Sequence, residues 1–334
     1  MTSNDGFLLP LDDAGQVLVR ARATNAEDGS VRLALKDPAP PLESRQDRSR
    51  QDLAHRFLEK AFAVFPEAQQ LELEPGLAQV LTTSDDDIVL LPPEARGEDG
   101  AARICRRSMF YQDARPWLRG RPASGFPQAA RPGPHGQPHP IRPPQPEGLV
   151  YERFDPQLGM TVSFRCIELE QDLDRFHAWM NDGRVAFFWE LAKPKAELAD
   201  YLTALQRDAH AFGLIGAFDG DPAGYFEVYW GKEDRLGAHY EADDYDRGWH
   251  GLIGNPRHLG RARTLAWLRS LTHYLFLDDI RTRKVVGEPN AAHTKLLRYA
   301  DAVAYYKVKE FDFPHKRAAL MHCDRETFFA KVRL

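Results

Sequence analysis

Two short apolar segments in the C-terminal half of the chain each carry one residue suited to proton transfer. The segment RGWHGLIG (247–254) contains His250, and KVVGEP (284–289) contains Glu288. A histidine titrates near neutral pH and can take or relay a proton, and a nearby carboxylate can orient it or act as a base itself. We therefore take His250 and Glu288 as candidate catalytic residues. A structural core histidine is the alternative at position 250.

A glycine-containing turn precedes a long helical pattern. In GNPRHLGRA (254–262), the spacing Arg257-x-x-Gly260-x-Ala262 places a glycine where the helix begins. The first backbone N–H groups of a helix have no partner inside it, and the helix dipole favours anions there. The candidate residues for binding an anionic cofactor are Arg257, His258, Leu259, Gly260, Arg261, Ala262 and Arg263. An ordinary strand-to-helix turn is the alternative.

The segment AGYFEVYW (223–230) carries polar residues that could contact a ligand. Strand alternation places Tyr225, Glu227 and Tyr229 on one face, and Lys232 and Asp234 follow in a loop. A carboxylate among tyrosines can meet a cationic group, and a Lys–Asp pair suits the two charged groups of an amino acid. The candidate contact residues are Trp189, Glu190, Glu227, Tyr229, Trp230, Lys232 and Asp234, with the run His315-Lys316-Arg317 as further cations. The alternatives are an exposed strand face for Glu227 and a surface ion pair for Lys232 with Asp234. For Trp189 the alternative is a position in the core, and for the run His315-Lys316-Arg317 it is a solvated surface.

The elements expected to position these residues follow the order β-α-α-β-β-β-α-β-α-β-β. Periodicity predicts them at 161–169 (strand), 171–181 and 194–210 (helices), 212–230 (hairpin), 247–254 (strand), 261–279 (helix), 283–289 (strand), 291–302 (helix), and 303–311 with 316–323 (strand pair). The helix at 261–279 is long and amphipathic, and it begins at the glycine turn.

The residues before position 116 are interpreted as an α+β domain without a chemical motif. We expect a strand pair at 15–23 and 30–36, and a helix at 51–65 with Leu53, Phe57, Leu58 and Phe62 on one face. Short strands are expected at 77–81 and 86–93. His55 is interpreted as a structural or surface histidine, and the run Asp85-Asp86-Asp87 as a solvated turn.

Proline marks the expected domain boundary. Ten of the 24 prolines fall between Pro116 and Pro146, in a stretch with no acidic residue. Because proline cannot donate to a ladder and disfavours a helical predecessor, this stretch is interpreted as an extended linker. The expected domains are therefore 1–115, a linker at 116–147, and 148–334.

Composition excludes several classes of protein. The chain has 334 residues, 43% of them hydrophobic, with a net charge of −5. Two folded domains fit this length, whereas whole-chain disorder does not fit the apolar content. No apolar run approaches the ~18 residues of a membrane helix, the N-terminus lacks the features of a secretory signal, and no basic excess suggests nucleic acid. Three scattered cysteines favour a reducing cytoplasm and no zinc site.

Six ordered blocks of the C-terminal half resemble the GNAT acyltransferase superfamily, in its siderophore-biosynthesis branch of aerobactin-type N-hydroxylysine and N-hydroxyornithine acyltransferases. The blocks are FHAWMNDGRVAFFWELA, GYFEVYWGKEDRL, DYDRGWHGLIG, LTHYLFLDD, VVGEP and YYKVKEFDFPHKRAAL. They span about Thr161 to Phe329, and the turn at Arg257–Ala262 matches the family's Q/R-x-x-G-x-G/A pattern.

The resemblance implies an α+β fold with a mixed sheet, and a degenerate GNAT-like half is one interpretation of the smaller N-terminal α+β domain. It implies acetyl-CoA or another acyl-CoA as co-substrate, with its pyrophosphate on the Arg257–Ala262 turn and no metal. It also implies that His250 and Glu288 flank a cleft between two splayed strands, where backbone N–H groups polarise the thioester carbonyl. No cysteine falls in the matched motifs, so direct transfer is expected.

The implied reaction acylates an N-hydroxylated amine to a hydroxamate, with the acceptor N6-hydroxylysine, N5-hydroxyornithine or an N-hydroxy-diamine. The implied context is cytoplasmic siderophore biosynthesis, without nucleic acid or membrane partners. A siderophore synthetase and an N-hydroxylase would be pathway neighbours, and a homodimer is one assembly that the family allows. Acylation of an unmodified amine, and non-catalytic binding of CoA, are the alternatives.

Two positions depart from the family pattern. Relatives often carry an Asp-Asn pair soon after the GEP block, where this chain has Ala292-His293. The usual Gly-Phe turn after the next helix is Ala304-Tyr305 here. The first departure puts cofactor contacts at that helix in doubt.

Overall fold

A computed structural model of the chain describes residues 7–8, 20–25, 29–35, 47–81, 102–133 and 138–334. The described residues divide into two compact units, and the division falls between Pro116 and Trp117. Each unit is described by itself.

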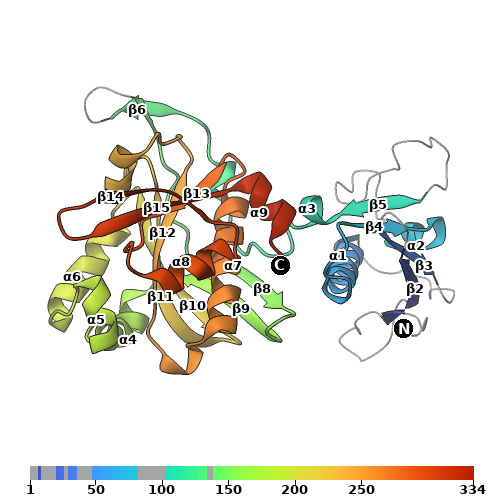
Figure 1. The fold of residues 1–334 in the computed structure, drawn as a ribbon, viewed down its shortest axis with the longest axis horizontal. Coiled ribbons are helices and arrows are strands. Elements are labelled where there is room, and N and C mark those ends of the chain that lie inside the picture. Colours follow the sequence, from blue (N-terminus) through green and yellow to red (C-terminus); the bar gives the residue numbers. More distant parts are fainter. Residues whose placement is uncertain (1–6, 9–19, 26–28, 36–46, 82–101, 134–137) are drawn as a thin grey trace. The chain divides into compact units, whose positions relative to one another are not determined.

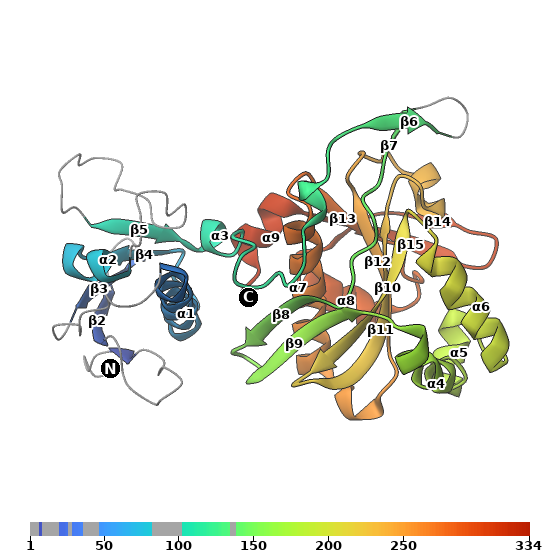
Figure 2. The same ribbon diagram turned by 180° about the vertical axis from the view of Figure 1, so that it is seen from behind.

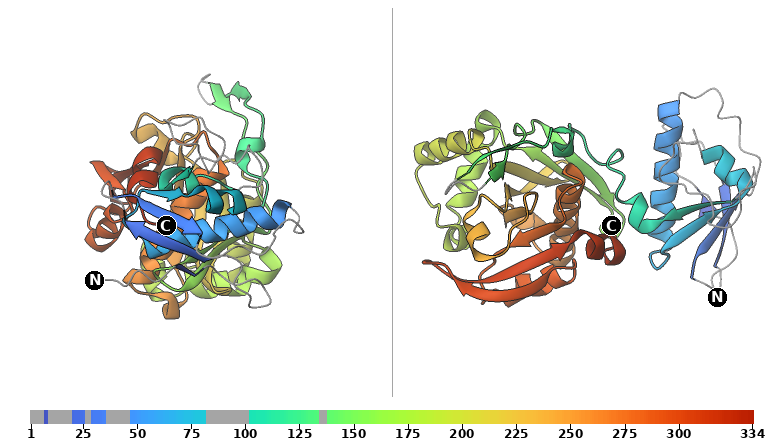
Figure 3. Two further views of the ribbon diagram at one scale, coloured as in Figure 1. Left: turned by 90° about the vertical axis from the view of Figure 1, so that its right-hand side faces the viewer. Right: turned by 90° about the horizontal axis from the view of Figure 1, so that it is seen from above.

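The first unit is an α+β body. Its described strands are β1 (Phe7–Leu8), β2 (Arg20–Asn25), β3 (Val31–Leu35), β4 (Gln70–Leu73) and β5 (Arg103–Arg106), and they form a sheet in that order. Helix α1 (Asp47–Val64) lies along this sheet, and Phe57, Leu58 and Phe62 are buried, as the helical pattern predicts (Figure 3). A short helix α3 (Arg107–Phe110) follows β5.

Residues 77–81 were expected to form a strand, and this prediction is wrong. They belong to helix α2 (Pro75–Leu81), in which Leu77, Ala78 and Leu81 are buried. Those three side chains share one helical face, and proline is well placed at a first helical turn. The expected strand at 86–93, the run Asp85–Asp87 and the side chain of Leu53 lie outside the described residues.

The second unit is built on a mixed sheet, and every strand of it lies in the fully described stretch 138–334. The order across the sheet is β14-β15-β13-β12-β11-β10-β9-β8 (Figure 1). The strands are β8 (Leu149–Asp155), β9 (Met160–Cys166), β10 (Ala211–Phe218), β11 (Asp221–Trp230), β12 (Arg247–Ile253), β13 (Lys284–Gly287), β14 (Tyr306–Asp312) and β15 (Arg317–Asp324). All neighbours are antiparallel except β12 and β13, which are parallel.

Helices cover both faces of this sheet. Helices α4 (Leu169–Met180), α5 (Gly183–Trp189) and α6 (Lys195–Gln206) pack on the face that carries Ile215, Tyr225 and Leu252. Helix α7 (Arg261–Asp278) lies on the opposite face, where the ring of Trp267 is centred 4.9 Å from that of Phe226 (Figure 1). Helices α8 (Thr294–Asp301) and α9 (Arg325–Lys331) complete the unit. From β9 to β15 the predicted order is present, with α5 inserted between α4 and α6, β8 added before β9 and α9 added after β15.

The proline-rich stretch differs from the expected linker, because its described residues from Trp117 on belong to the second unit. Trp117 is buried and packs against the ring of His273. The guanidinium of Arg142 forms two hydrogen bonds with Glu233, at 2.8 and 2.6 Å. The side-chain amide of Gln145 donates to the carbonyls of residues 205, 208 and 211. Prolines exclude this stretch from the sheet core, but these polar anchors fix it on the unit's surface.

Between Trp117 and β8, the same stretch forms a small hairpin of β6 (Ala130–Pro132) and β7 (Pro138–Pro140). The hairpin stands out from the second unit (Figure 2). At the start of β7 the hairpin contacts the loop after β11, because Lys232 Nζ donates to the carbonyl oxygen of Pro138 at 3.3 Å.

A buried ionic group joins β8 to α7. Asp155 is 1% exposed, and its Oδ2 accepts from Arg153 at 3.1 Å and from Arg269 at 3.0 Å. Burial would raise the pKa of Asp155, but the two guanidinium groups outweigh burial and lower it. This group holds α7 against β8, an edge strand of the sheet.

No helix among the described residues is both long and apolar enough to cross a lipid bilayer. Within the same residues, no group of three or more His, Cys, Asp or Glu side chains is arranged to hold a metal ion. The three cysteines are free, and Cys105 and Cys323 are buried.

Candidate active site

The pairing of β11 with β12 gathers the polar residues of both strands on one face of the sheet. Glu227 lies opposite His250, and Tyr229 lies opposite Gly248. A side chain at Gly248 would collide with the ring of Tyr229, because its Cβ would lie 2.1 Å from a ring carbon. The glycine therefore lets Tyr229 lie flat across β12 and reach the next strand.

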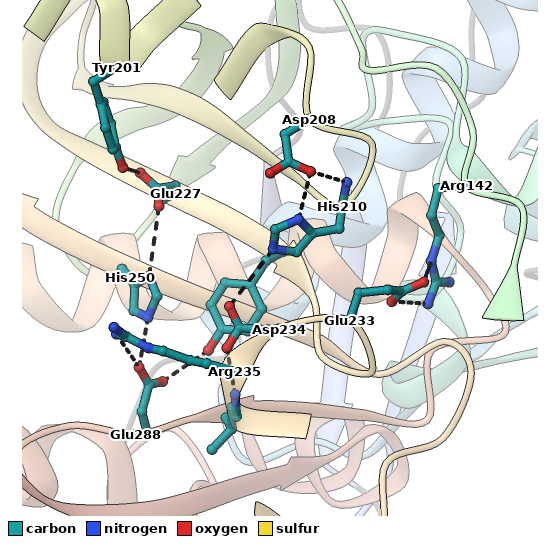
Figure 4. Close-up of polar contacts among 12 residues, drawn as sticks. Arg142, Tyr201, Asp208, His210, Glu227, Glu233, Asp234, Arg235, His250 and Glu288 are labelled. Atoms are coloured by element: carbon teal, nitrogen blue, oxygen red, sulfur yellow. Dashed lines mark hydrogen bonds and ion pairs between the residues drawn. The ribbon is translucent and has the colours of Figure 1, made fainter. Parts of the chain in front are cut away.

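Strands β12 and β13 separate immediately before His250. Their parallel pairing consists of Arg247 with Val285 and Gly248 with Val286. Strand β12 continues to Ile253, whereas β13 ends at Gly287 and Glu288 follows it. The opening is bridged by side chains, since His250 Nε2 lies 2.8 Å from Glu288 Oε1 (Figure 4). The expected juxtaposition of His250 and Glu288 is thus present in the structure.

Glu288 is buried among donors. Only 1% of its side chain is exposed, and Tyr229 donates to its Oε2 at 3.0 Å. Its Oε1 lies 3.3 Å from Arg235 Nη2 and 3.7 Å from Lys316 Nζ. Burial would raise the pKa of Glu288, but His250, Lys316 and Arg235 outweigh it and hold that pKa far below its usual range. The carboxylate is therefore ionised at neutral pH.

A second carboxylate lies on the other side of the imidazole. Glu227 Oε1 is 4.0 Å from His250 Nδ1, and the hydroxyl of Tyr201 donates to Glu227 Oε2 at 2.5 Å (Figure 4). The hydroxyl of Tyr225 donates to the same oxygen at 2.8 Å. These donors and the imidazole outweigh burial and lower the pKa of Glu227. Burial and the Glu227 charge raise the pKa of both tyrosines, which stay protonated as donors.

His250 consequently lies between two carboxylates. Burial would lower its pKa, but Glu288 and Glu227 outweigh burial and raise that pKa to about 10. At neutral pH the imidazole is protonated, and the titration belongs to the group Glu227–His250–Glu288 as a whole. A quarter of the side chain is exposed. This arrangement gives a positioned proton donor that becomes a base after it has given up its proton.

Aromatic rings border this group. The ring of Tyr229 is centred 4.9 Å from that of His250, and the ring of Trp189 lies 6.4 Å away. Trp189 ends α5, which Arg184 ties to the end of β12 through the carbonyl of Ile253 at 2.7 Å. Glu190 follows in a left-handed conformation and is exposed. Trp189 therefore lies at the group as expected, whereas among the described residues the Glu190 side chain forms no hydrogen bond or ion pair with it.

The turn before α7 has the expected form. Asn255 accepts from the backbone N–H of Arg257, and Gly260 precedes the first residue of α7 with φ +123°. Arg257, Leu259, Arg261 and Ala262 are exposed, and Arg263 is half-buried. His258 is buried, and its Nε2 lies 2.8 Å from Asp221 Oδ2, so this histidine supports the turn from beneath.

Gly260 provides a test of the turn. Its φ and ψ of +123° and 159° lie in a region that essentially only glycine adopts, although a Cβ there would meet no atom within 4 Å. We expect Gly260→Ala to strain the turn by about 1–3 kcal/mol and raise KM for acyl-CoA roughly tenfold, with a smaller effect on kcat. Initial-rate kinetics measure both. Gly159→Ala, at a glycine with φ +69° and the same free space, is the control. An unchanged KM for acyl-CoA in Gly260→Ala would show that the turn does not contribute to acyl-CoA binding.

Three of the predicted contact residues lie in other surroundings. Trp230 faces away from Glu227, between the guanidinium groups of Arg142 and Arg247, which lie 4.3 and 4.1 Å from its ring centre. Lys232 forms an ion pair with Asp244. Asp234 caps a short helical turn by accepting from Leu236 N, and its Oδ2 lies 3.9 Å from His210 (Figure 4).

The two departures from the family pattern have structural roles here. His293 caps α8, where its Nδ1 accepts from Leu296 N at 3.2 Å, and its ring lies against Phe188. Ala304 adopts φ +62°, which sets the turn that buries Tyr305. The hydroxyl of Tyr305 bonds Trp249 Nε1 and Thr272 Oγ1.

Sequence reasoning missed two residues of this group. Tyr201 reaches Glu227 from α6, and Arg235 reaches Glu288 from the loop after β11. Arg235 lies inside one of the six matched blocks, so a search of those blocks for cations would have found it. Tyr201 carries no such signal, because a tyrosine on an amphipathic helix is ordinary core.

The chain is similar to known acyltransferases. A family described as "Acetyltransferase (GNAT) domain" matches residues 168–313. N(6)-hydroxylysine O-acetyltransferase of Escherichia coli is 43% identical over 195 residues, which are 58% of this chain and 62% of that protein. A putative lysine N-acyltransferase of Schizosaccharomyces pombe is 39% identical over 292 residues, 86% of this chain and 85% of that protein.

A third relative is named for hydroxyornithine. Hydroxyornithine transacylase SID3 of Ajellomyces capsulatus is 40% identical over 198 residues, 58% of this chain and 45% of that protein. The chain thus spans less than two thirds of the length of the E. coli and A. capsulatus relatives. Among solved structures, an uncharacterized protein (bh2621) of Bacillus halodurans superposes with a TM-score of 0.51 at 30% identity, covering 53% of this chain and 91% of that one.

Proposed function

The chain belongs to the GNAT acyltransferase family, and from this premise we propose that it acylates an N-hydroxylated amine with acyl-CoA to give a hydroxamate for siderophore biosynthesis. The acceptor class comprises N6-hydroxylysine, N5-hydroxyornithine and N-hydroxy-diamines, and acetyl-CoA is the simplest donor. The observation that carries the proposal is the imidazole of His250 held between Glu227 and Glu288 where β12 and β13 part. The names of the E. coli and A. capsulatus relatives support the acceptor.

The turn before α7 suits the pyrophosphate of a CoA donor. Helix α7 has 18 residues, so its N-terminus presents unpaired N–H groups and the positive end of a full helix dipole. Arg257 and Arg261 are exposed beside it. Arg263 follows in the first turn of α7 and is half-buried.

The chemistry of the step needs two proton transfers. Acyl-CoA supplies a thioester that is activated toward nitrogen nucleophiles. The nitrogen–carbon bond forms and the carbon–sulfur bond breaks, so one proton must leave the nitrogen and one must reach the sulfur. His250 begins protonated, gives its proton to the leaving sulfur, and then takes the proton of the nitrogen. Glu288 and Glu227 hold the ring in place throughout, and backbone N–H groups of β12 beyond Gly248 polarise the carbonyl.

The proton balance predicts how activity depends on pH. Because the imidazolium form is present at neutral pH and is lost as the pH rises through about 10, kcat should fall over that range. Glu227→Gln removes one of the two carboxylates, so the pKa of His250 should drop and the descending limb should move to lower pH by about one unit or more. Rates of hydroxamate formation between pH 6 and 11 measure this. Glu326→Gln, on the exposed first turn of α9, is the control. A limb that does not move would contradict the role of Glu227.

A panel of donors and acceptors tests the proposed function itself. We expect free thiol and ferric-binding hydroxamate to appear together when acetyl-CoA is combined with N6-hydroxylysine, N5-hydroxyornithine or N-hydroxycadaverine. A hydroxamate offers two hard oxygen ligands to ferric iron, so an iron complex reports the product directly. If none of the N-hydroxylated acceptors caused release of free thiol, the proposal would be overturned. If the chain bound acyl-CoA but released no thiol with any acceptor, the result would point to a non-catalytic protein.

Acylation of an unmodified amine is the second candidate. The name of the S. pombe relative, which matches most of this chain, favours a lysine amine. A lysine ammonium has a pKa of about 10.4 and must lose a proton before it attacks, so its acylation should rise steeply with pH. A hydroxylamine is largely unprotonated at neutral pH, so its acylation should stay flat there. Side-by-side rates with lysine and N6-hydroxylysine at pH 7 separate the two.

The proposal extends to the cellular context. An N-hydroxylase would supply the acceptor, and a siderophore synthetase would consume the hydroxamate in iron acquisition. We propose a cytoplasmic location and a homodimer as the assembly.

A further inference from the structure

Three cations converge on one oxygen atom of Glu288. His250 Nε2, Arg235 Nη2 and Lys316 Nζ lie 2.8, 3.3 and 3.7 Å from Glu288 Oε1. Glu288 neutralises one of these three positive charges, and Glu227 neutralises a second from the far side of the imidazole. The group Glu227–His250–Glu288–Arg235–Lys316 therefore carries one surplus positive charge beside the candidate active site.

The neighbouring acids are engaged elsewhere. Asp234 caps the turn at Leu236 and faces His210, which also pairs with Asp208 at 2.6 Å. These carboxylates raise the pKa of His210 to about 9, and its imidazolium neutralises one of their two charges. Lys232, the cation that sequence reasoning favoured, is held by Asp244. Asp234 attracts Lys316 electrostatically, but among the described residues no ion pair within 4 Å joins either aspartate to Arg235 or Lys316.

Both cations have donors to offer. Half of the Arg235 side chain and a fifth of the Lys316 side chain are exposed. Among the described residues, the only side-chain hydrogen bond or ion pair of either group is the one to Glu288. Arg235 Cζ and Lys316 Nζ lie over the ring of Phe313, 5.3 and 5.8 Å from its centre, so this ring helps to hold both cations in position. A guanidinium can bind a carboxylate through two parallel hydrogen bonds, and an ammonium beside it adds a second positive charge.

We propose that Arg235 and Lys316 bind the α-carboxylate of the acceptor, so that the enzyme selects an N-hydroxylated amino acid over the corresponding N-hydroxylated diamine. This inference rests on the proposed function. His250 marks where the reacting nitrogen lies, and it shares one carboxylate oxygen with both cations. A short methylene chain is therefore enough to connect a nitrogen at His250 with a carboxylate at Arg235 and Lys316.

Matched acceptors test the inference. N6-hydroxylysine and N-hydroxycadaverine differ by the α-carboxylate alone, so the wild-type chain should prefer N6-hydroxylysine in kcat/KM. Arg235→Met and Lys316→Met should each raise KM for N6-hydroxylysine about tenfold to a hundredfold and leave KM for N-hydroxycadaverine within about threefold. Lys307→Met, on β14, removes a lysine already paired with Glu310 at 3.0 Å and should change neither value.

Other outcomes distinguish a failure of the inference from a failure of the proposed function. Equal losses for both acceptors in the two variants, or a wild-type enzyme without preference, would overturn carboxylate binding while hydroxamate formation stood. Failure of the wild type with N6-hydroxylysine, N-hydroxycadaverine and N5-hydroxyornithine alike would overturn the proposed function instead. Calorimetric binding of N6-hydroxylysine and N-hydroxycadaverine in the presence of CoA provides a readout without turnover, and equal affinities there would also overturn the inference.

Discussion

Replacing His250 with alanine is expected to lower kcat for hydroxamate formation about 10²- to 10⁴-fold, the usual contribution of a positioned acid–base group. The variant loses the proton donor for the leaving sulfur, and it leaves Glu227 and Glu288 facing each other without the cation between them. KM for acyl-CoA should change little, because the turn before α7 does not contact His250. Steady-state rates with acetyl-CoA and N6-hydroxylysine measure both constants.

Two further variants separate chemistry from structure. His250→Gln keeps a hydrogen-bonding side chain but cannot titrate, so its activity should fall nearly as far as that of His250→Ala. His177→Ala, on α4 and outside the Glu227–His250–Glu288 group, should retain wild-type rates. Full turnover in His250→Ala would mean that this histidine does not move the proton.

The largest expected effect on stability is at Asp155. Asp155→Ala leaves the guanidinium groups of Arg153 and Arg269 buried without their shared carboxylate, and breaking such a group costs about 3–5 kcal/mol. Because the pKa of Asp155 is lowered in the folded chain, this contribution is present at neutral pH and is lost in acid. Urea unfolding followed by tryptophan fluorescence measures it for the second unit, since all six tryptophans lie at position 117 or beyond.

An exposed aspartate provides the control for that measurement. Asp312 pairs with Arg317 at 3.2 Å, but 70% of its side chain is exposed. Solvent screens such pairs, so Asp312→Ala should change the free energy of unfolding by less than about 1 kcal/mol. Equal effects of the two substitutions would show that the Arg153–Asp155–Arg269 group contributes no more than a surface ion pair.

Much of the candidate site could be predicted because it lies on strands with clear alternation. The faces of Glu227 and His250 followed from period two, and the family pattern placed Glu288 beside the histidine. The same alternation placed Trp230 on the face opposite Glu227, where the structure has it, so its inclusion among the contact residues had no support from that pattern. Chemistry on regular elements is readable from sequence when the period is respected.

The remaining residues come from loops and from tertiary packing, which carry no period. Arg235 and Lys316 are 81 positions apart and meet only because both approach Glu288. Residues 77–81 fit either period, since Leu77 and Leu81 are four apart and also two alternations apart, and tertiary packing selected the helix. Composition identified the prolines as outside the core, but it could not show that Arg142 and Gln145 anchor that stretch.

The anchored stretch has a consequence for how this gene could exchange parts with its homologues. The expected linker ends after the last proline of the stretch, and the C-terminal domain was expected to begin at Gly148. A crossover there would separate β10, α6 and the loop after β11 from Gln145 and Arg142, which bond to them. A crossover before Trp117 keeps both partners in one parent. Arg142, Gln145 and the residues they bind are thus expected to be inherited as one block.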